Sequence, residues 1–496
     1  MRQEPLITAS VAGPISARAP SSELPLAKRD LTVPFRFVVA ISFTVALVGV
    51  RDLLYGTAGN VILSILFWAI GVTVSILASR SLERQERVFL IRTFVLAFSL
   101  RVLAAVVLWM LVLSMTGVPF HPGGDDADFD RHGQWIAEAW RAGDWGYRLS
   151  GSYSVFENGY NYVVATVYYL GGIFGGSDQL GAVLLNCLFG ALLVLPGYRI
   201  ARTFYGESIA RRASAFLAFA PDLFLYSLVE LRDILIALLI IVLAWCVSDY
   251  LVGYGKISKI VIGAIIAAYA VPALRIELLP VTFATLAANF AAISAGRLKV
   301  RQNPRLFAAL GLLMAISVLF YVQGEFLIAM FSNPFEPVNR YVEHYRATAA
   351  MESLGVHFFT LPIYLRLPAN LGMLMTLPFP PWAGIQYDRT WFSVLQTVEA
   401  PFWYVVAPYF LIGMMWSFRE NKFLYFPVYG TCLIWIIAAS FGAMVDLRWR
   451  TMVMPMMLVI AAVGWQHRRK YVIVPGLWWA AIMVAVLAYI FLKWLV

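Results

Sequence analysis

Four aspartates stand close together in the segment PFHPGGDDADFDRHGQWIAEAWRAGD (119–144), directly after a long apolar run. They are Asp125, Asp126, Asp128 and Asp130, and His132 follows them. Capping of a helix start explains one aspartate well but not four. An ionised aspartate can act as a general base on an acceptor hydroxyl, while arginines, with their planar and permanently charged forks, hold a departing phosphate. The cluster therefore predicts an acid–base site.

Arginine and carboxylate residues recur together in three short turns between apolar runs. These are ELRD with Glu230, Arg232 and Asp233, PALRIE with Arg275 and Glu277, and DLRWR with Asp446, Arg448 and Arg450. Mutual salt bridges and contacts with lipid headgroups would explain any single pair. Several such turns on one face indicate a site, because ionisable residues at membrane depth are commonly functional.

The elements that must position these residues are membrane helices. Of the 496 residues, 61% are hydrophobic and 13% are charged, whereas about 25% of residues are charged in an average soluble protein. Apolar stretches of roughly 18 or more residues recur along the chain, and this length spans a bilayer. The sequence predicts an all-α polytopic membrane protein. Its three cysteines lie inside apolar runs, so neither a disulfide framework nor a zinc site is expected.

Lys and Arg clusters fall between alternate apolar runs, which is typical of cytoplasmic loops and explains the net charge of +10 without a nucleic-acid partner. If every cluster faces the cytoplasm, the chain crosses about 13 times, with its N-terminus inside and its C-terminus outside. The expected spans are 37–53, 58–78, 93–116, 178–198, 213–230, 234–251, 258–274, 278–295, 305–323, 401–417, 423–443, 451–466 and 471–492. Residues 158–176 are expected to be re-entrant or interfacial, because a full span there breaks the charge alternation.

This topology divides the chain into five parts. They are a flexible cytoplasmic N-terminal segment (1–35), a transmembrane hairpin (36–79), a transmembrane catalytic core (80–323) with a first outer loop at 117–157, a second outer loop (324–400), and C-terminal transmembrane helices (401–496). Both outer loops are expected to carry amphipathic interfacial helices. In the first, Trp135, Ile136, Ala139 and Trp140 recur at helical spacing. In the second, Tyr341, His344 and Arg346 either shape the loop over the site or, as we favour, form one wet helical face.

Five segments between residues 93 and 470 resemble motifs of the GT-C superfamily of polyprenyl-phosphate-dependent glycosyltransferases. The resemblance is to bacterial family-39-like members, of the protein O-mannosyltransferase and aminoarabinose transferase type. The segments are GDDADF (124–129) with GQWIAEAWRAG (133–143), NGY (158–160), APDLFLYSLVELRD (220–233), LPFPPWAGI (377–385) and RWRTMVMP (448–455). Phe129 replaces the commoner tyrosine, the doubled aspartate leaves the catalytic acid ambiguous, and the first hairpin is an addition to the family pattern.

This resemblance implies that one sugar is transferred, with inversion, from an undecaprenyl-phosphate carrier to a lipid, glycan or protein acceptor at the periplasmic face of a bacterial inner membrane. It implies that Asp125 is the base, with Asp126 as the second choice. Arg448 and Arg450 would hold the donor phosphate, followed by Arg232 and Arg275. His132 either donates to this phosphate or, as is more common for a His on a polar helix face, is only solvated. Further candidate site residues are Asp128, Asp233, Glu277 and Tyr160.

Other functions fit the sequence less well. Asp125, Asp126 and Asp128 offer oxygen ligands for Mg²⁺ or Mn²⁺, but the family resembled is mainly metal-independent, so a catalytic metal stays open. A polysaccharide polymerase or ligase would carry its site in a late outer loop rich in Arg and His. A flippase or transporter would bury charges near the membrane midplane in repeated halves. The sequence contains no phosphate-binding glycine loop, so a soluble nucleotide-sugar enzyme is disfavoured. It contains no WWDYG motif either, so transfer of an oligosaccharide to asparagine is not expected.

Overall fold

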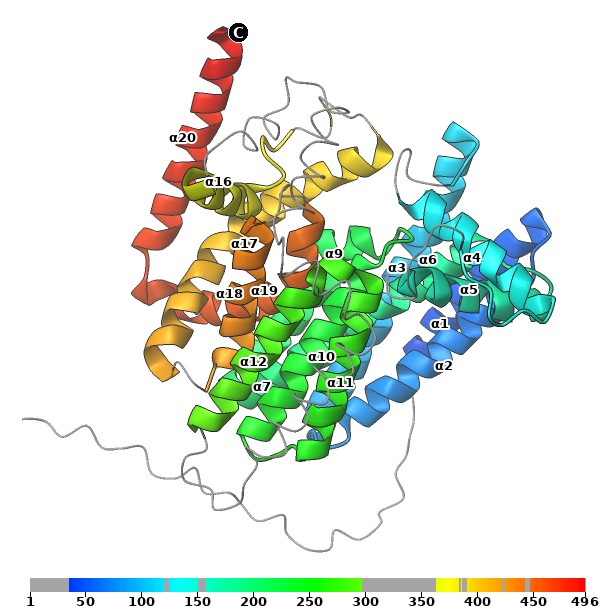
Figure 1. The fold of residues 1–496 in the computed structure, drawn as a ribbon, viewed down its shortest axis with the longest axis horizontal. Coiled ribbons are helices and arrows are strands. Elements are labelled where there is room, and N and C mark those ends of the chain that lie inside the picture. The colour runs from blue at the N-terminus through cyan, green and yellow to red at the C-terminus, as the bar shows by residue number, and fades with distance from the viewer. Residues whose placement is uncertain are drawn as a thin grey trace, which may run out of the picture.

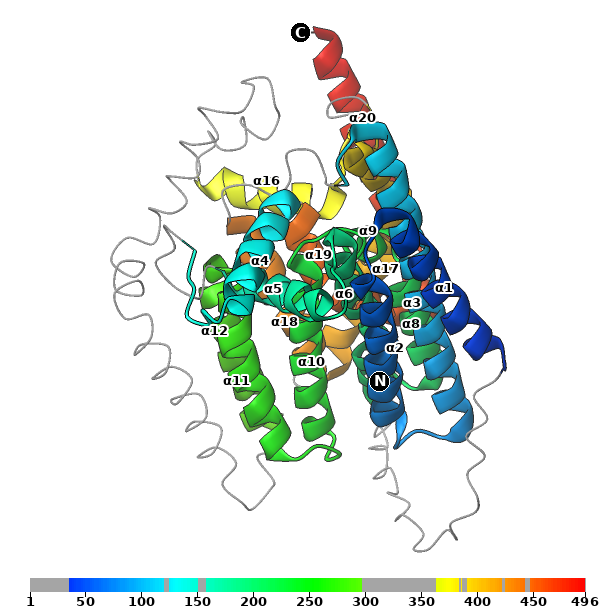
Figure 2. The ribbon, with the colours of Figure 1, turned by 90° about the vertical axis from the view of Figure 1, so that its right-hand side faces the viewer.

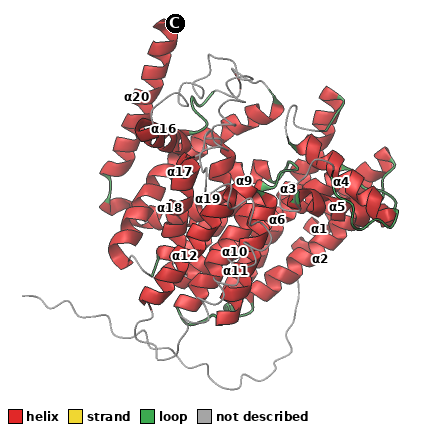
Figure 3. Cartoon of the chain, viewed as in Figure 1, coloured by secondary structure: helices red, strands yellow, loops and turns green. Residues whose placement is uncertain are grey.

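The computed structural model describes residues 35–119, 125–149, 158–296, 363–382, 385, 390–421, 424–441 and 447–495. The regular elements in these ranges are all helices, joined by turns and loops (Figure 3). In chain order they are α1 (Phe35–Tyr55), α2 (Gly59–Ser79), α3 (Arg84–Thr116), α4 (Asp126–Arg141), α5 (Gly159–Ile173), α6 (Gln179–Leu192), α7 (Val194–Tyr205), α8 (Glu207–Phe219), α9 (Pro221–Tyr226), α10 (Asp233–Leu251), α11 (Ile257–Leu274), η2 (Ile276–Leu278), α12 (Leu279–Gly296), α16 (Ile363–Thr376), α17 (Trp391–Asn421), α18 (Phe426–Phe441), α19 (Leu447–His467), η4 (Arg468–Lys470) and α20 (Ile473–Leu495).

The prediction of an all-α polytopic membrane protein is confirmed. Nine helical segments in the described part of the chain are long and apolar enough to cross a membrane, and two shorter apolar helices, Ile276–Phe290 and Phe426–Ser440, accompany them. The expected span at 305–323 lies outside the described residues, so the count of thirteen stays a prediction. Tyr341, His344, Arg346 and Asp446 also lie outside them.

One expected span is different in the structure. Residues 213–230 form no single helix, because α8 ends at Phe219 and the short α9 begins at Pro221. Proline has no backbone N–H to continue the hydrogen-bond ladder, and the residue before it is driven out of the helical region. Ala220 accordingly has an extended backbone, with ψ of 121°. The break brings the ELRD turn into the protein interior, where Glu230 is fully buried.

The core of the bundle lies around α19, which packs along α17 and α8. Glycines allow the closest approach: a Cβ on Gly464 would stand 1.7 Å from the Tyr409 carbonyl oxygen, and one on Gly413 would stand 2.0 Å from that of Ile460. Small residues at helix contacts are typical of membrane bundles, where backbone proximity replaces the hydrophobic effect. By contrast, only 6% of the apolar window of α20 is buried, and this helix projects beyond the bundle at the C-terminus (Figures 1 and 2).

The helices α10 and α19 have different kinds of charged residues next to their two ends. α10 begins at Asp233, in the ELRD turn, and ends at Leu251, just before Lys256. With 19 residues it spans about 28 Å, close to the thickness of the hydrocarbon core. α19 likewise begins beside Arg448 and ends before the basic η4 segment RRK. Each helix therefore separates a mixed Arg–carboxylate turn from a turn that carries only basic residues.

The N-terminal hairpin of α1 and α2 is fastened to the core by a buried polar network. Arg51 forms ion pairs with Asp52 and with Asp178, the residue that caps α6. Asn60 donates to both Asp52 and Asp178, at 3.0 and 3.1 Å. The Arg51 guanidinium also lies 3.7 Å from the ring centre of Trp109 on α3. The hairpin is therefore built into the protein next to the start of α6, and it is more than a membrane anchor.

Candidate active site

Arg448 joins two aspartates that come from distant parts of the chain. Its Nη1 donates to Asp125 Oδ2 at 2.8 Å, and its Nε donates to Asp233 Oδ2 at 3.1 Å. Asp125 precedes the first turn of α4, Asp233 begins α10, and Arg448 is in the first turn of α19. The segment before α4, the ELRD turn and the first turn of α19 thus meet at one point.

Asp233 is the fixed centre of this group. Its side chain is fully buried, and Arg275 approaches its second oxygen at 3.4 Å. Arg275 also lies 3.9 Å from Glu277, a more exposed carboxylate, and its guanidinium is 4.7 Å from the ring centre of Trp449. A buried carboxylate that carries two arginines holds both forks in defined positions. Those arginines are therefore preorganised for an anionic ligand.

Arg232 is the third cation near Asp125. Its Nη1 donates to the Leu274 carbonyl at 2.8 Å, and its guanidinium lies 5.6 Å from the ring centre of Phe129 on α4. Burial, together with the nearby charge of Arg275, lowers the pKa of Arg232 to about 10, although Asp233 opposes this shift. Arg232 therefore stays charged at neutral pH. The three arginines surround Asp125, which is half exposed, with its side chain 51% accessible.

The ionisation of Asp125 follows from this surrounding charge. Burial raises the pKa of its carboxyl, but Arg448, Arg232 and Arg275 outweigh that effect and the net result is a pKa below the usual value. Asp125 is therefore an anion throughout the neutral range. As a base it is weakened by the Arg448 contact, and it becomes stronger when that contact is released.

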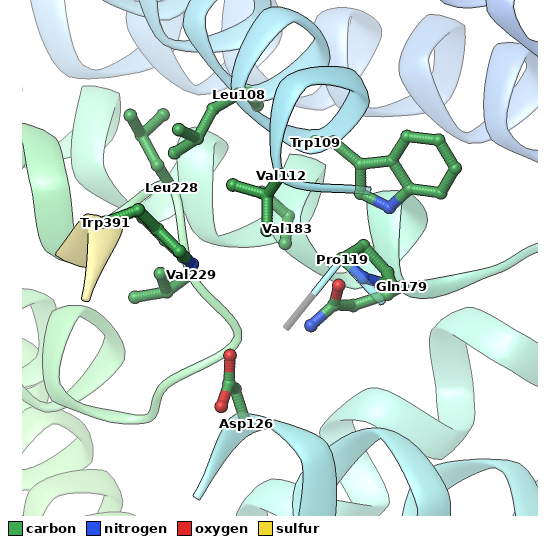
Figure 4. Close-up of a pocket in the computed structure, with 11 residues that line it drawn as sticks. Leu108, Trp109, Val112, Pro119, Asp126, Gln179, Val183, Leu228, Val229 and Trp391 are labelled. Atoms are coloured by element: carbon green, nitrogen blue, oxygen red, sulfur yellow. The ribbon is translucent and has the colours of Figure 1, made fainter. Parts of the chain in front are cut away.

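Asp126 differs sharply from its neighbour. It is the first residue of α4, its side chain is almost fully buried at 1% exposure, and it faces a small pocket lined by α3, α6 and α17 (Figure 4). Phe129, one turn later, packs edge-on against Tyr160 of α5 with ring centres 4.9 Å apart. This contact fixes the start of α4 against α5. The two adjacent aspartates thus occupy an open, arginine-lined site and a closed pocket respectively.

The remaining candidates lie outside the arginine group. Asp128 is exposed and pairs with Arg131 at 2.6 Å on the outer face of α4. His132 lies against Trp135, with ring centres 5.4 Å apart and the ring planes tilted by 50°. Arg450 is fully buried, forms an ion pair with Glu399 and donates to the Leu377 carbonyl at 2.6 Å. Its environment is that of a structural residue, although sequence analysis grouped it with Arg448 for the donor phosphate.

Two further carboxyl groups are buried, that of Asp130 on α4 and that of Glu230 in the ELRD turn. Asp130 accepts hydrogen bonds from the Tyr168 hydroxyl and, at 3.0 Å, from Gln134 Nε2. Glu230 is fully buried and neither of its carboxyl oxygens has a hydrogen-bond partner. Burial, reinforced by Asp130 and Asp126, raises the pKa of Glu230 well above its usual value. In the folded protein, the Glu230 carboxyl group therefore keeps its proton at pH values where an ordinary glutamate is ionised.

Replacing Glu230 with Gln is expected to stabilise the protein increasingly as the pH rises from 4.5 to 8. Above about pH 4.3 the unfolded chain loses the Glu230 proton, whereas the folded chain keeps it until the pH reaches the folded-state pKa. In this range Glu230 lowers the free energy of unfolding by up to about 1.4 kcal/mol per pH unit. Thermal unfolding of wild type and variant at several pH values measures this. Glu138→Gln, an exposed acid on α4, is the control and should show no growing difference. A Tm gain independent of pH would contradict the assignment.

Metal ligation finds no support in the described residues, which contain no group of three His, Cys, Asp or Glu side chains placed to hold an ion. The four aspartates of the motif point in different directions: Asp125 to arginine, Asp126 to the pocket, Asp128 to Arg131, and Asp130 to Tyr168. One helix turn separates side chains over all of its faces, which is why a dense run of acids need not converge.

Sequence analysis did not identify several residues that build the site region. Arg51, Trp109 and Asp178 fasten the hairpin beside the pocket, and Gln179 lines the pocket. Arg51 was the one available signal, because an arginine and an aspartate within an apolar hairpin need partners inside the protein. Trp109 and Gln179 stand in ordinary apolar or helix-start contexts and carry no such signal.

Comparison with known proteins finds similar solved structures only: no family model matches the chain, and no curated protein matches it. ArnT from Cupriavidus metallidurans bound to undecaprenyl phosphate is 17% identical over 74% of this chain and 59% of that chain, with a TM-score of 0.41. The archaeal oligosaccharyltransferase AglB from Archaeoglobus fulgidus, in complex with an inhibitory peptide and a dolichol-phosphate, is 14% identical over 73% and 50%, with a TM-score of 0.43. The apo form of the Archaeoglobus fulgidus oligosaccharyltransferase is 16% identical over 78% and 51%, with a TM-score of 0.47. The chain thus spans between half and three fifths of the length of each structure.

Proposed function

We propose that this protein is a membrane glycosyltransferase that moves a single sugar, with inversion, from a polyprenyl-phosphate donor to an acceptor hydroxyl. The observation that carries the proposal is the position of Arg448 between Asp125 and Asp233, with Arg275 and Arg232 beside them. A carboxylate and several arginines at the end of membrane helices match the two needs of this reaction. The reaction needs a base that takes the proton of the acceptor, and it needs cations that bind the departing phosphate.

The reaction follows from the roles of these groups. Asp125 takes the proton from the acceptor hydroxyl as the acceptor oxygen forms a bond to the anomeric carbon. The bond between that carbon and the phosphate oxygen breaks on the opposite face, which inverts the configuration. Arg448, Arg275 and Arg232 stabilise the negative charge that develops on the departing polyprenyl phosphate. Arg450 has no part in this step, because it is buried against Glu399.

Arg448 also couples donor binding to base activation. Before the donor arrives, Arg448 holds Asp125 at 2.8 Å and depresses its basicity. A phosphate competes with the carboxylate for the same guanidinium edge, while the Nε contact to Asp233 keeps the side chain in place. Release of Asp125 raises its proton affinity when the sugar donor is present. Asp125 therefore becomes a stronger base only after the donor phosphate has bound to Arg448.

The membrane orientation belongs to the same proposal. The basic turns after α10 and before α20 would face the cytoplasm, in accordance with the positive-inside rule. The arginine–aspartate site then lies on the extracytoplasmic face, which in a bacterium is the periplasmic side of the inner membrane. The donor lipid would reach it laterally from the outer leaflet.

The proposal is tested by native mass spectrometry of lipid kept by the Asp125→Asn variant, extracted with its surrounding bilayer in copolymer nanodiscs. We expect a polyprenyl phosphate or a polyprenyl-phosphate sugar, and the residual mass identifies the sugar. A retained lipid-linked oligosaccharide would instead favour a polysaccharide polymerase or ligase. Bulk phospholipid alone, from preparations that also fail to bind added undecaprenyl phosphate, would contradict the proposal.

Replacing Arg448 with Met should weaken the binding of undecaprenyl phosphate about 10- to 150-fold. This corresponds to the loss of one charge-assisted hydrogen bond, about 1.5–3 kcal/mol. Titration of labelled lipid into nanodisc-embedded protein measures the change. Arg131→Met removes an exposed arginine from α4 and should leave binding unchanged. Equal affinities of the Arg448→Met variant and the wild type would remove Arg448 from the phosphate site.

A further inference from the structure

A small pocket lies beside Asp126, where helices from four regions of the chain meet. Its walls are mostly apolar and include Leu108 and Val112 of α3 and Leu228, just before the ELRD turn, while Trp109 of α3, Asp126 of α4 and Gln179 of α6 supply polar groups. Figure 4 shows the Gln179 amide and the Asp126 carboxylate extending toward the same space from different sides. The pocket therefore has one polar region within an apolar enclosure.

Two polar atoms at this pocket are buried and have no hydrogen-bond partner. They are the indole Nε1–H of Trp109, a donor, and the amide Oε1 of Gln179, an acceptor. The two residues are 8% and 4% exposed. No hydrogen bond joins them to each other, so the donor and the acceptor are both left available to a third group. A buried polar group without a partner is costly, and most such groups in native proteins are satisfied by water or by a ligand.

The size of the space limits what that group can be. The pocket has a cavity volume of about 10 Å³, which is close to the minimum for one water molecule. A sugar ring would need several polar partners and much more space. A single oxygen that accepts one hydrogen bond and donates another fits both the volume and the two unpartnered atoms.

We propose that this pocket is a binding site for one hydroxyl group. The hydroxyl oxygen accepts the Trp109 Nε1–H, and its proton is donated to Gln179 Oε1, with the Asp126 carboxylate at the edge of the same space. The hydroxyl belongs either to a water molecule or to an aliphatic alcohol. Of the alcohol, only the hydroxyl group would enter the water-sized space, and its carbon chain would extend toward the open side of the pocket, past Leu108, Val112 and Leu228.

Arg51 of the N-terminal hairpin holds the polar region of the pocket in place. Its guanidinium lies over the Trp109 ring and pairs with Asp178, the neighbour of Gln179. A cation over an indole ring draws electron density from it, which makes the ring N–H a stronger donor. Arg51 is therefore a positioning residue for both polar partners, and the hairpin acquires a role in ligand binding.

The position of Asp126 gives this site a role that rests on the proposed function. An alcohol held here presents its hydroxyl next to Asp126, the second candidate base and the chain neighbour of Asp125, so we infer that the site is a subsite for the acceptor. An acceptor that fits carries its hydroxyl on a small apolar carbon, as in a Ser or Thr side chain or a lipid alcohol. A densely hydroxylated sugar ring does not fit. The binding of a hydroxyl does not itself depend on sugar transfer.

Fluorine NMR of 5-fluorotryptophan-labelled protein in nanodiscs tests the binding site without any assay of activity. The Trp109 resonance is the one missing from the Trp109→Phe variant. We expect 1-propanol to shift it saturably, whereas 1-chloropropane, of similar size but without the hydroxyl, does not. The resonance of the exposed Trp145 (62% accessible) reports any general effect of the alcohol on the bilayer and should shift only linearly.

The experiment distinguishes three cases: the hydroxyl belongs to an alcohol, the hydroxyl belongs to water, or the pocket binds no hydroxyl. A saturable propanol shift assigns the site to an alcohol. A shift on exchange of H₂O for D₂O without any propanol response assigns it to water and removes the acceptor subsite. A Trp109 resonance that responds to neither shows a dry pocket and overturns the proposal. These results are independent of lipid retention, so failure of the hydroxyl site and failure of the proposed transferase function are distinguishable.

Gln179→Leu should weaken the propanol response about fivefold, the effect of losing one hydrogen bond. Gln134→Leu, the same substitution at an exposed position of α4, should leave it unchanged. If Gln179→Leu does not fold, Gln179→Met removes the same acceptor with a side chain of similar length. An unchanged response in a folded Gln179 variant would contradict the assignment of Gln179 as the acceptor.

Discussion

Asp125→Asn is expected to lower the rate of sugar transfer by about 10²–10⁴, the usual contribution of a positioned general base. The amide keeps the size of the carboxyl group and can still accept a hydrogen bond from Arg448, but it cannot take a proton from the acceptor. Since Asp125 is half exposed, folding should be unaffected. Donor affinity should be unchanged or slightly higher, because the phosphate no longer competes with a charged carboxylate for Arg448. Transfer from a synthetic polyprenyl-phosphate sugar, with the product identified by mass, measures the rate.

Asp126→Asn and Asp128→Asn complete this experiment. Asp128 pairs with Arg131 on the exposed face of α4, so its variant should be fully active and serves as the matched control. If Asp126→Asn is inactive while Asp125→Asn works, the base is the buried aspartate at the pocket. If both variants remain active, the general-base mechanism is wrong. A loss of activity in all three would indicate damage to α4 rather than to catalysis.

The membrane helices and the convergence of charged turns could be predicted from the sequence because both follow from simple physical rules. Hydrophobic length predicts spanning helices, and alternation of basic clusters predicts which helix ends lie together. From the latter, the ELRD and DLRWR turns were expected on one face with the aspartate motif. The ion pairs of Arg448 with Asp125 and Asp233 agree with this expectation.

What could not be predicted depends on side-chain direction and on contacts distant in sequence. Arg448 and Arg450 are two residues apart, and the helical rotation between them sends the first to Asp125 and the second to Glu399. Periodicity alone does not say which face of α19 meets α17. Pro221 is visible in the sequence, but the apolar run continues across it, so hydropathy predicted one helix over residues 213–230. The helix breaks there because proline cannot continue the backbone hydrogen bonds.

The N-terminal hairpin shows a different limit. Its two apolar runs were predicted to be a pair of spans, and α1 and α2 are long and apolar enough for this. The attachment of the hairpin to the core, however, depends on Arg51, which reaches Asp178 and Trp109 across more than fifty residues of intervening chain. Such a contact has no local signature. In the sequence, the one indication that Arg51 needs partners inside the protein is the high free-energy cost of a charge within a membrane helix.

Arg450→Met is expected to destabilise the folded protein by about 3–5 kcal/mol, the usual cost of breaking a buried ion pair by removing one partner. Arg450 is fully buried, pairs with Glu399, donates to the carbonyl groups of Leu374 and Leu377, and stacks over Trp403 with its guanidinium 4.6 Å from the ring centre. Its loss leaves the Glu399 carboxylate buried without its counter-charge. Unfolding in increasing SDS, monitored by tryptophan fluorescence, measures the change.

The double variant Arg450→Met/Glu399→Leu separates structure from catalysis. Replacing both charges with apolar side chains removes the desolvation cost together with the attraction, so most of the lost stability should return. The exposed pair of Asp128 and Arg131 is the comparison, and Arg131→Met should cost at most about 1 kcal/mol. If Arg450 is structural, the double variant transfers sugar at the wild-type rate per folded molecule. A stable Arg450→Met protein that has lost its affinity for polyprenyl phosphate would return Arg450 to the donor site, where its RWR spacing with Arg448 first placed it.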